Sequence, residues 1–261
     1  AMIWEGINRE CETYTFGQMK RLTNKFANVL KSVGVGKQDR IVIFMDRIPE
    51  FYIAFLGTLK IGAIAIPLHA TSNHDFLKNS LKDSKAKVMI SQTYLRHGVS
   101  LIIPELFDLQ HIIVVNRDNN DYELVDIADL NYETEMTKAS ANYDVVPMSQ
   151  YDYSILHYTF DETGNFNGLA YSHEAVAQHC FNGHQILGFK EDDIYWCTSD
   201  PSYVTGIGCG ILTPWSNGLT QFIYEGGFDI NIWCDLIEKH KISVWCTATS
   251  AIRMLITSGD D

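Results

Sequence analysis

Apolar positions along the first half of the chain alternate between helical spacing and short β-branched runs. Helical spacing follows Thr15, which forms a capping-box pattern with Gln18, and Pro49 opens a second helical pattern that Gly62 ends. A third helical pattern covers 76–85. Strand-like runs separate the helical ones, and they cover 40–45, 63–68, 87–91 and 111–115. This alternation predicts α/β layers with largely parallel strand pairing.

The second half repeats the alternation after a polar and irregular stretch. We expect residues 116–147 to form a surface excursion between two subregions, about 10–135 and 150–258. Helices are predicted after the N-cap residues Ser172 and Asp229. The remaining predicted segments are helices at 206–215 and 250–256, and strands at 153–159, 194–198, 220–224 and 243–247.

Composition narrows the classes of partner. The 261 residues are 46% hydrophobic, which suffices for a large core, and the formal net charge of −12 argues against DNA, RNA and acidic membrane surfaces. No apolar run is long enough to cross a bilayer. The six cysteines show neither a C-x-x-C pair nor zinc-ligand spacing with histidine. We therefore expect reduced, buried thiols in a cytoplasmic protein and no metal site.

A polar, glycine-bearing loop at 160–168 follows the predicted strand 153–159. Its neighbourhood offers hydroxyls and flexible backbone at Thr159, Thr163, Gly164 and Gly168. N–H groups and hydroxyls of this kind donate to phosphate oxygens, and glycines let the backbone approach them. Taken alone, the pattern is a weak indication of a phosphate site.

Several separate motifs in a fixed order strengthen this indication. The loop resembles Y-T-S-G-[ST]-T-G-x-P-K-G of the adenylate-forming superfamily, which includes acyl-CoA synthetases, luciferases and peptide-synthetase adenylation domains. Sequence blocks on both sides of the loop also resemble those of acetyl-CoA synthetases. Downstream of the loop they cover 193–206, 214–218, 225–229 and 247–255, and upstream of it they cover 34–41 and 60–63. The resemblance implies that residues 1–261 form a truncated N-terminal domain of the acyl-CoA synthetase fold. It also implies ligase chemistry with ATP, magnesium and CoA.

The loop departs from the family pattern at five positions. Phe160 and Asp161 stand where the family has Ser and Gly, Glu162 replaces Ser or Thr, and Phe166 and Asn167 replace Pro and Lys. One cation has been exchanged for two carboxylates that would face a polyanion. Two unit charges ~4 Å apart interact by ~1 kcal/mol in water and ~4 kcal/mol at an effective dielectric near 20. A magnesium ion held by the two carboxylates would offset this repulsion.

The resemblance also marks a candidate acyl and CoA pocket at Tyr203, Val204, Thr205 and Gly206. Weak binding of a small acid or of CoA is expected there. The alternative is that Tyr203 and Val204 only pack the start of a helix. Longer family members carry adenine and ribose motifs and a C-terminal domain with a lysine that serves adenylation, and we expect these parts to be absent here.

Three functions follow from these expectations and stay open at this point. The first is a catalytically incompetent paralogue, a pseudoenzyme with no catalytic residue and no firmly expected cofactor, that acts by binding. The second is one half of a split AMP-forming acyl-CoA synthetase, completed by another chain. The third is an interaction or regulatory partner of a full-length synthetase, or a homodimer.

Overall fold

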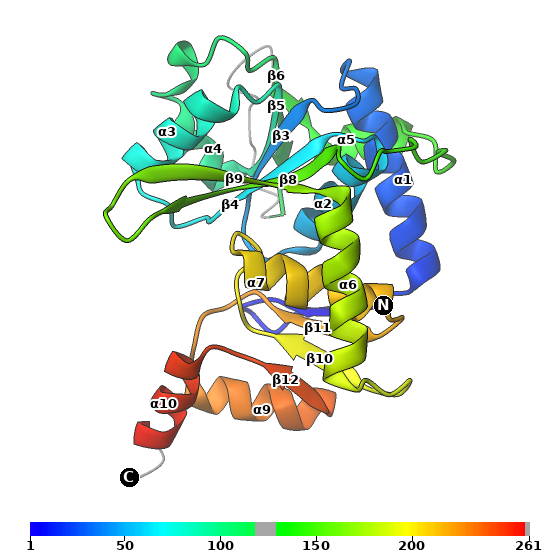
Figure 1. Ribbon diagram of the computed structural model, residues 1–261, viewed down its shortest axis with the longest axis vertical. Helices are drawn as coiled ribbons and strands as arrows, with labels where there is room; N and C mark the ends of the chain where they lie inside the picture. Colours follow the sequence, from blue (N-terminus) through cyan, green and yellow to red (C-terminus); the bar gives the residue numbers. More distant parts are fainter. Residues whose placement is uncertain (118–128, 259–261) are drawn as a thin grey trace. The chain divides into compact units, whose positions relative to one another are not determined.

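Two α/β sheets organise the chain in a computed structural model that describes residues 1–117 and 129–258 (Figure 1). One compact unit comprises residues 17–175, and the other combines residues 1–16 with 176–261. The units differ from the two consecutive subregions expected above, because strands at the N-terminus join the sheet of the C-terminal part. The predicted α/β layers are confirmed.

The unit of residues 17–175 contains a seven-stranded sheet with the order β7-β6-β5-β3-β4-β8-β9. Its strands are β3 (Arg40–Phe44), β4 (Ile64–Leu68), β5 (Val88–Gln92), β6 (His111–Val115), β7 (Asp129–Asn131), β8 (Tyr153–Phe160) and β9 (Phe166–Ser172). All neighbouring strands are parallel except β8 and β9. Strands β4 and β5 are buried along their whole length, as parallel strands covered on both faces are.

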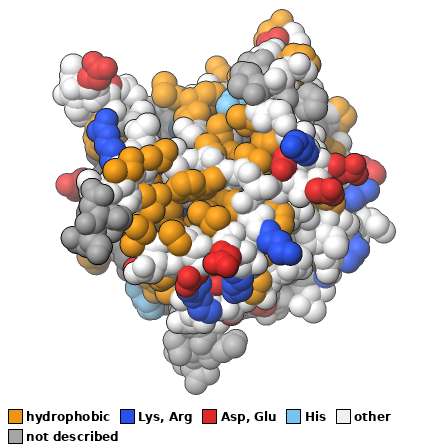
Figure 2. Space-filling model, turned by 90° about the horizontal axis from the view of Figure 1, so that it is seen from below, with side chains coloured by type: hydrophobic (Ala, Val, Ile, Leu, Met, Phe, Trp, Pro, Cys, Tyr) orange, Lys and Arg blue, Asp and Glu red, His pale blue; other side chains and the backbone are white. Residues whose placement is uncertain are grey.

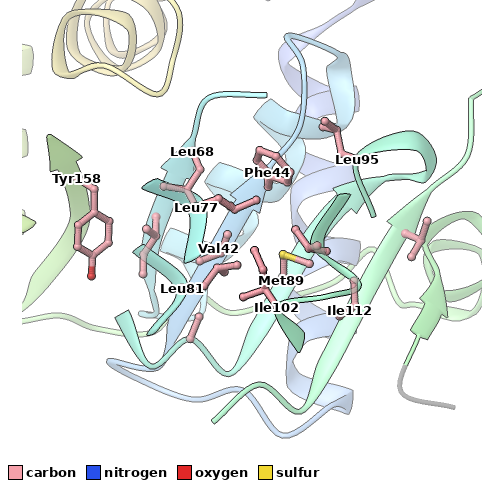
Figure 3. Close-up of a cluster of buried hydrophobic side chains, with 14 of the residues drawn as sticks. Val42, Phe44, Leu68, Leu77, Leu81, Met89, Leu95, Ile102, Ile112 and Tyr158 are labelled. Atoms are coloured by element: carbon pink, nitrogen blue, oxygen red, sulfur yellow. The ribbon is translucent and has the colours of Figure 1, made fainter. Parts of the chain in front are cut away.

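Helices pack against this sheet through apolar faces. They are α1 (Phe16–Ser32), α2 (Pro49–Lys60), α3 (His74–Ser84), α4 (Thr93–Val99), the 3₁₀ turn η1 (Ile103–Glu105) and α5 (Tyr132–Lys138). The Asn73 side chain caps α3 by accepting from the Phe76 N–H at 2.8 Å. Leu77 and Leu81 of α3 then pack on Val42 and Met89 of the sheet (Figure 3). This packing fixes α3 beside the end of β8, where the candidate site begins.

The polar stretch after β6 is more regular than its sequence predicts. Residues 118–128 of the expected excursion lie outside the described residues. Beyond them, β7 pairs with β6, and the Asn131 side chain caps α5 by accepting from the Thr134 N–H at 2.8 Å. Tyr132 and Met136 of α5 are buried. The expected irregular excursion is therefore wrong for 129–138, because two apolar residues four positions apart suffice to bury one face of a short helix.

The other unit contains a five-stranded sheet with the order β12-β10-β11-β1-β2. Its strands are β1 (Met2–Glu5), β2 (Cys11–Tyr14), β10 (Ile194–Cys197), β11 (Thr220–Tyr224) and β12 (Val244–Cys246). The hairpin of β1 and β2 was not predicted, and β1 lies parallel to β11. Trp196, Phe222 and Trp233 form the centre of this unit's core.

Helical segments follow one another through the described residues 173–258. They are α6 (His173–Leu187), α7 (Val204–Ile207), the π-helical turn η2 (Gly208–Leu212), α8 (Thr213–Ser216), α9 (Ile230–His240) and α10 (Thr249–Ser258). The predicted caps are confirmed, because Ser172 Oγ accepts from the Ala175 N–H and Asp229 accepts from the Ile232 N–H. Within the described ranges, no helix has the length and apolar character needed to cross a membrane.

Candidate functional site

The segment that resembles a phosphate loop is the tip of an antiparallel hairpin in the 17–175 unit. Strands β8 and β9 pair as far as Phe160 and Phe166, which leaves residues 161–165 in the loop. Thr159 was expected just before the loop and Gly168 within it, and both lie within the paired strands. The predicted loop at 160–168 is therefore too long, because the pairing continues into the motif itself.

The carboxylate of Asp161 is the acceptor for the donors of this tip. Its Oδ1 accepts from the backbone N–H of Thr163 at 2.9 Å, from the Thr163 hydroxyl at 2.6 Å and from the Asn165 N–H at 2.9 Å. Its Oδ2 accepts from the side-chain amides of Asn165 at 3.2 Å and Asn167 at 3.1 Å. These bonds, first those of Thr163 and then those of Asn165, hold the pKa of Asp161 well below its usual range. The tip thus has an anionic acceptor within its own sequence.

The backbone of the tip closes around the same residue. Gly164 has φ +83°, a left-handed conformation that favours glycine, and its N–H donates to the Asp161 carbonyl at 2.9 Å. The Asp161 N–H donates in turn to the Asn165 carbonyl at 2.9 Å. A Cβ added to Gly164 would meet no atom within 4 Å, so conformation rather than space requires glycine here. Thr163 and Gly164, two of the expected phosphate-binding residues, are therefore used to build the turn.

Two further departures from the family pattern pack together beside the tip. The Phe166 ring stacks on Tyr158 with 4.9 Å between centroids and lies 6.1 Å from the Phe160 ring. Phe76 of α3 completes the cluster, 5.5 Å from Phe160 and 5.7 Å from Phe166. The Tyr158 hydroxyl donates to Asp83 at 2.7 Å, and burial together with this bond raises the pKa of Tyr158. The cluster fastens the hairpin to α3.

The five substituted positions therefore form two groups and one outlier. Phe160 and Phe166 belong to the aromatic cluster, Asp161 and Asn167 belong to the polar network, and Glu162 is exposed. The backbone N–H groups of Thr163 and Asn165 thus already donate to a carboxylate. Across residues 1–117 and 129–258, no set of three or more His, Cys, Asp and Glu is placed to hold a metal ion.

The candidate acyl and CoA segment lies in the other unit, where a turn after β10 leads into the first residues of α7. Asp200 Oδ1 accepts from the Ser202 N–H at 2.9 Å and from the Ser202 hydroxyl at 2.6 Å. Gly206 is buried, and a Cβ there would lie 1.9 Å from the backbone oxygen of Asp200. The close approach of two backbone segments therefore requires glycine at this position.

The other three residues of this candidate segment face outward. Tyr203 and Val204 keep 62% and 43% of their surface exposed, and Thr205 is exposed as well. The apolar groups of Tyr203 and Val204 are thus only partly covered at the start of α7. The arrangement presents an aromatic ring, an aliphatic group and a hydroxyl from one short segment.

Sequence reasoning missed two residues that close the hairpin tip. Asn165 occupies the unrestricted position of the family pattern, so comparison with the motif cannot mark it. Asn167 was identified only as a lost lysine, whereas its amide donates to Asp161. The available signal was the concentration of Asp, Asn and Gly in 161–167, which is typical of turns whose side chains bond to the local backbone.

Comparison with known proteins places the whole chain in one family. Residues 1–261 match the family described as AMP-binding enzyme. Acetyl-coenzyme A synthetase of Bacillus subtilis (strain 168) is 38% identical over 262 residues, which are 100% of this chain and 45% of that protein. Acetyl-coenzyme A synthetase of Rubrobacter xylanophilus is 30% identical over 273 residues, covering 99% of this chain and 42% of that protein.

A solved structure with the same fold is the crystal structure of Brucella canis acyl-CoA synthetase. It matches with a TM-score of 0.89 at 20% sequence identity, covering 99% of this chain and 46% of that one. The chain thus spans less than half the length of these relatives and corresponds to their N-terminal portion. The family match over its full length shows that the chain belongs to the AMP-binding enzyme family.

Proposed function

We propose that the hairpin tip does not bind ATP, and that the chain acts by binding other molecules rather than by adenylate formation. One observation carries this proposal: the Asp161 carboxylate accepts five hydrogen bonds from the tip's own donors. To admit a phosphate, the tip would have to release that carboxylate and then hold it beside another anion. The family's lysine, which would offset the charge, is Asn167 here.

The hydrogen-bonded tip differs from a phosphate loop that has only lost its lysine. A loop that had merely lost its lysine would still offer backbone N–H groups to a phosphate. Here Asp161 accepts from the backbone N–H groups of Thr163, Gly164 and Asn165, and the Phe160 and Phe166 rings fix the strands on either side. Because the satisfied groups gain little from a new acceptor, binding of a triphosphate would lose hydrogen bonds as well as face repulsion.

Titration calorimetry with Mg-ATP tests this proposal. The chain should give no saturable heat up to millimolar nucleotide. A variant with the family residues restored at all five positions, Phe160→Ser, Asp161→Gly, Glu162→Thr, Phe166→Pro and Asn167→Lys, should bind at least about a hundredfold more tightly. Circular dichroism would confirm that both proteins are folded.

A charge-neutral control separates two effects: electrostatic repulsion between the carboxylates and the phosphates, and occupancy of the tip's N–H donors by an internal acceptor. Asp161→Asn with Glu162→Gln removes both charges but keeps an acceptor at the centre of the tip, so it should recover less binding than the restored loop. Micromolar binding of Mg-ATP by the unaltered chain would overturn the proposal. Binding that disappears when EDTA removes magnesium would show that an ion bridges the carboxylates and the phosphates.

A second candidate function is supported by the exposed apolar surface. Figure 2 shows a face on which hydrophobic side chains gather, and helix α10 exposes Ile252, Met254 and Ile256 to 44%, 47% and 64%. Apolar surface of this kind fits a protein partner. The partner would be a chain that carries the rest of the AMP-binding fold, which would make this chain half of a cytoplasmic acyl-CoA synthetase with its acyl segment at Tyr203–Gly206.

Acetate-dependent pyrophosphate exchange distinguishes the two candidates. The chain alone should be inactive under either. Exchange that appears when a complementing chain is added, and that falls at least tenfold with Ile256→Asp, would establish the split enzyme. Exchange absent from every mixture would leave only the binding role.

A further inference from the structure

Three cysteines from three different elements meet in the unit that contains β10, β11 and β12. Cys197 ends β10 and Cys246 ends β12, and the two are direct partners across this parallel strand pair. Cys209 of the π-helical turn packs in the same small cluster, next to the buried ring of Tyr195. The expectation of buried thiols is wrong for Cys11 and Cys234, which are exposed.

The strand pairing permits a covalent bond between two of these sulfurs. Neighbouring strands lie about 4.8 Å apart, and residues directly opposite each other point to the same face of the sheet. A disulfide requires Cα atoms about 4.4–6.8 Å apart. Cys197 and Cys246 satisfy both conditions through their register alone. Strand β12 is an edge strand of only three residues, so it can adjust locally to the bond.

Burial and hydrogen bonding give the thiols different reactivities. Cys197 is buried, whereas Cys209 and Cys246 are partly exposed. Hydrogen bonds from Cys197 and then from Cys209 lower the pKa of Cys246. The bond to Cys246 and burial raise the pKa of Cys197, which therefore stays protonated. Cys246 is thus partly accessible and ionises more readily than Cys197, which is its buried neighbour.

We propose that Cys197 and Cys246 form a reversible disulfide when the protein meets a hydroperoxide. The Cys246 thiolate attacks the terminal peroxide oxygen, the O–O bond breaks, and the leaving oxygen takes up the proton that the thiol lost. The Cys197 sulfur then attacks the Cys246 sulfenic acid, the S–O bond breaks, and water leaves with the Cys197 proton. Two thiols are oxidised by two electrons, and hydrogen peroxide is reduced to two waters.

The disulfide would link the ends of β10 and β12, and a motif segment follows each of these strands. Immediately after the cysteines, the Thr198 N–H donates to the Cys246 carbonyl at 3.0 Å, and the hydroxyls of Thr198 and Thr247 lie 2.6 Å apart. The chain continues from Thr198 into the turn at 200–206 and from Thr247 into α10. Oxidation would therefore restrain the base of the candidate acyl segment.

Hydrogen peroxide titration of the native chain, followed by alkylation and mass spectrometry, tests the proposal. The free thiol of Cys246 should disappear about tenfold faster than that of Cys234, an exposed cysteine on α9. Chymotrypsin should release a crosslinked pair of peptides that holds Cys197 and Cys246, because cleavage after Tyr203 separates Cys197 from Cys209. Dithiothreitol should restore both thiols.

Cysteine variants separate the role of Cys246, which reacts with the peroxide, from that of Cys197, which forms the disulfide. With Cys197→Ser, Cys246 should stop at a sulfenic acid that dimedone traps, whereas the matched control Cys234→Ser should leave the crosslink unchanged. The proposal is overturned if Cys246 oxidises no faster than Cys234, or if it reaches sulfonic acid without a crosslink. A crosslink between Cys209 and Cys246 in place of the expected one would overturn the pairing.

Discussion

The hairpin tip and the turn at 200–206 use the same local device in different settings. In each, an aspartate Oδ1 accepts from the N–H and the hydroxyl of the residue two positions on, at 2.9 and 2.6 Å. Asp200 belongs to a stretch that matches the acetyl-CoA synthetase pattern, whereas Asp161 replaces a glycine of that pattern. The same small turn therefore organises both of the expected motif segments.

The two regions also differ in what surrounds them. Residues 161–165 of the tip are all exposed, and the aromatic cluster holds only its base. The turn at 200–206 is closed by the backbone approach of Gly206 to Asp200. Substitutions in the turn should therefore affect the stability of its unit, whereas substitutions in the tip should act locally.

Gly206→Ala should have the largest effect. The new Cβ would overlap the backbone oxygen of Asp200, and relief of that overlap requires a backbone shift, so we expect a loss of about 3 kcal/mol in the free energy of unfolding. Chemical denaturation measures it. Gly227→Ala is the matched control, since its Cβ would meet no atom within 4 Å. Equal midpoints for the two variants would contradict the account of this turn.

Phe166→Ala should have an intermediate effect. The ring is partly buried between Tyr158 and Phe76, so its removal should lower the free energy of unfolding by about 1–2 kcal/mol, less than loss of a fully buried ring. The same denaturation experiment applies. Phe107→Ala is the control, because that side chain is 95% exposed and should be silent. A silent Phe166→Ala would show that the cluster does not fasten the hairpin.

Asp161→Ala should act mainly within the tip. Loss of the shared acceptor should speed hydrogen exchange of the Thr163 and Asn165 amides by on the order of tenfold, while the melting temperature changes little. Glu162→Ala should leave both exchange rates unchanged. Unaltered exchange in Asp161→Ala would mean that the carboxylate does not organise the tip.

The pH dependence of the tip should be the smallest effect near neutrality. The pKa of Asp161 is lowered in the folded chain, so its stabilisation is complete above the unfolded value near 3.9 and is lost as the pH falls toward the folded value. Intrinsically corrected exchange of the Thr163 amide should stay constant from pH 7 to about 4 and rise below that. Titration of the Asp161 carboxyl near pH 4 in NMR spectra would contradict this.

Much of the fold could be predicted from local patterns. Pro49–Lys60, His111–Val115 and Thr220–Tyr224 have the predicted bounds, because a proline, a glycine or a polar residue marks each end. Strands β1, β2, β7 and β9 were missed. The first three have three or four residues each, too few for a period to show, and β1 pairs with the distant strand β11. Strand β9 overlaps the predicted loop at 160–168 and forms by pairing with β8.

The site was only partly accessible to sequence reasoning. The motif comparison predicts five positions at which the loop departs from the family pattern, and these stay predictions. It treated Asp161 and Glu162 alike, as two charges facing a ligand, whereas the structure turns Asp161 into its own loop and leaves Glu162 exposed. That distinction depends on the register of β8 and β9, and register is a property of the folded hairpin.

The central claim is that Asp161 occupies the donors with which a phosphate loop would bind nucleotide. The most direct test follows the ¹⁵N–¹H resonances of Thr163, Gly164 and Asn165 while Mg-ATP is added to millimolar concentration. We predict that these three resonances stay in place. Saturable shifts confined to them would show that the tip releases Asp161 to bind the nucleotide, which would contradict the account.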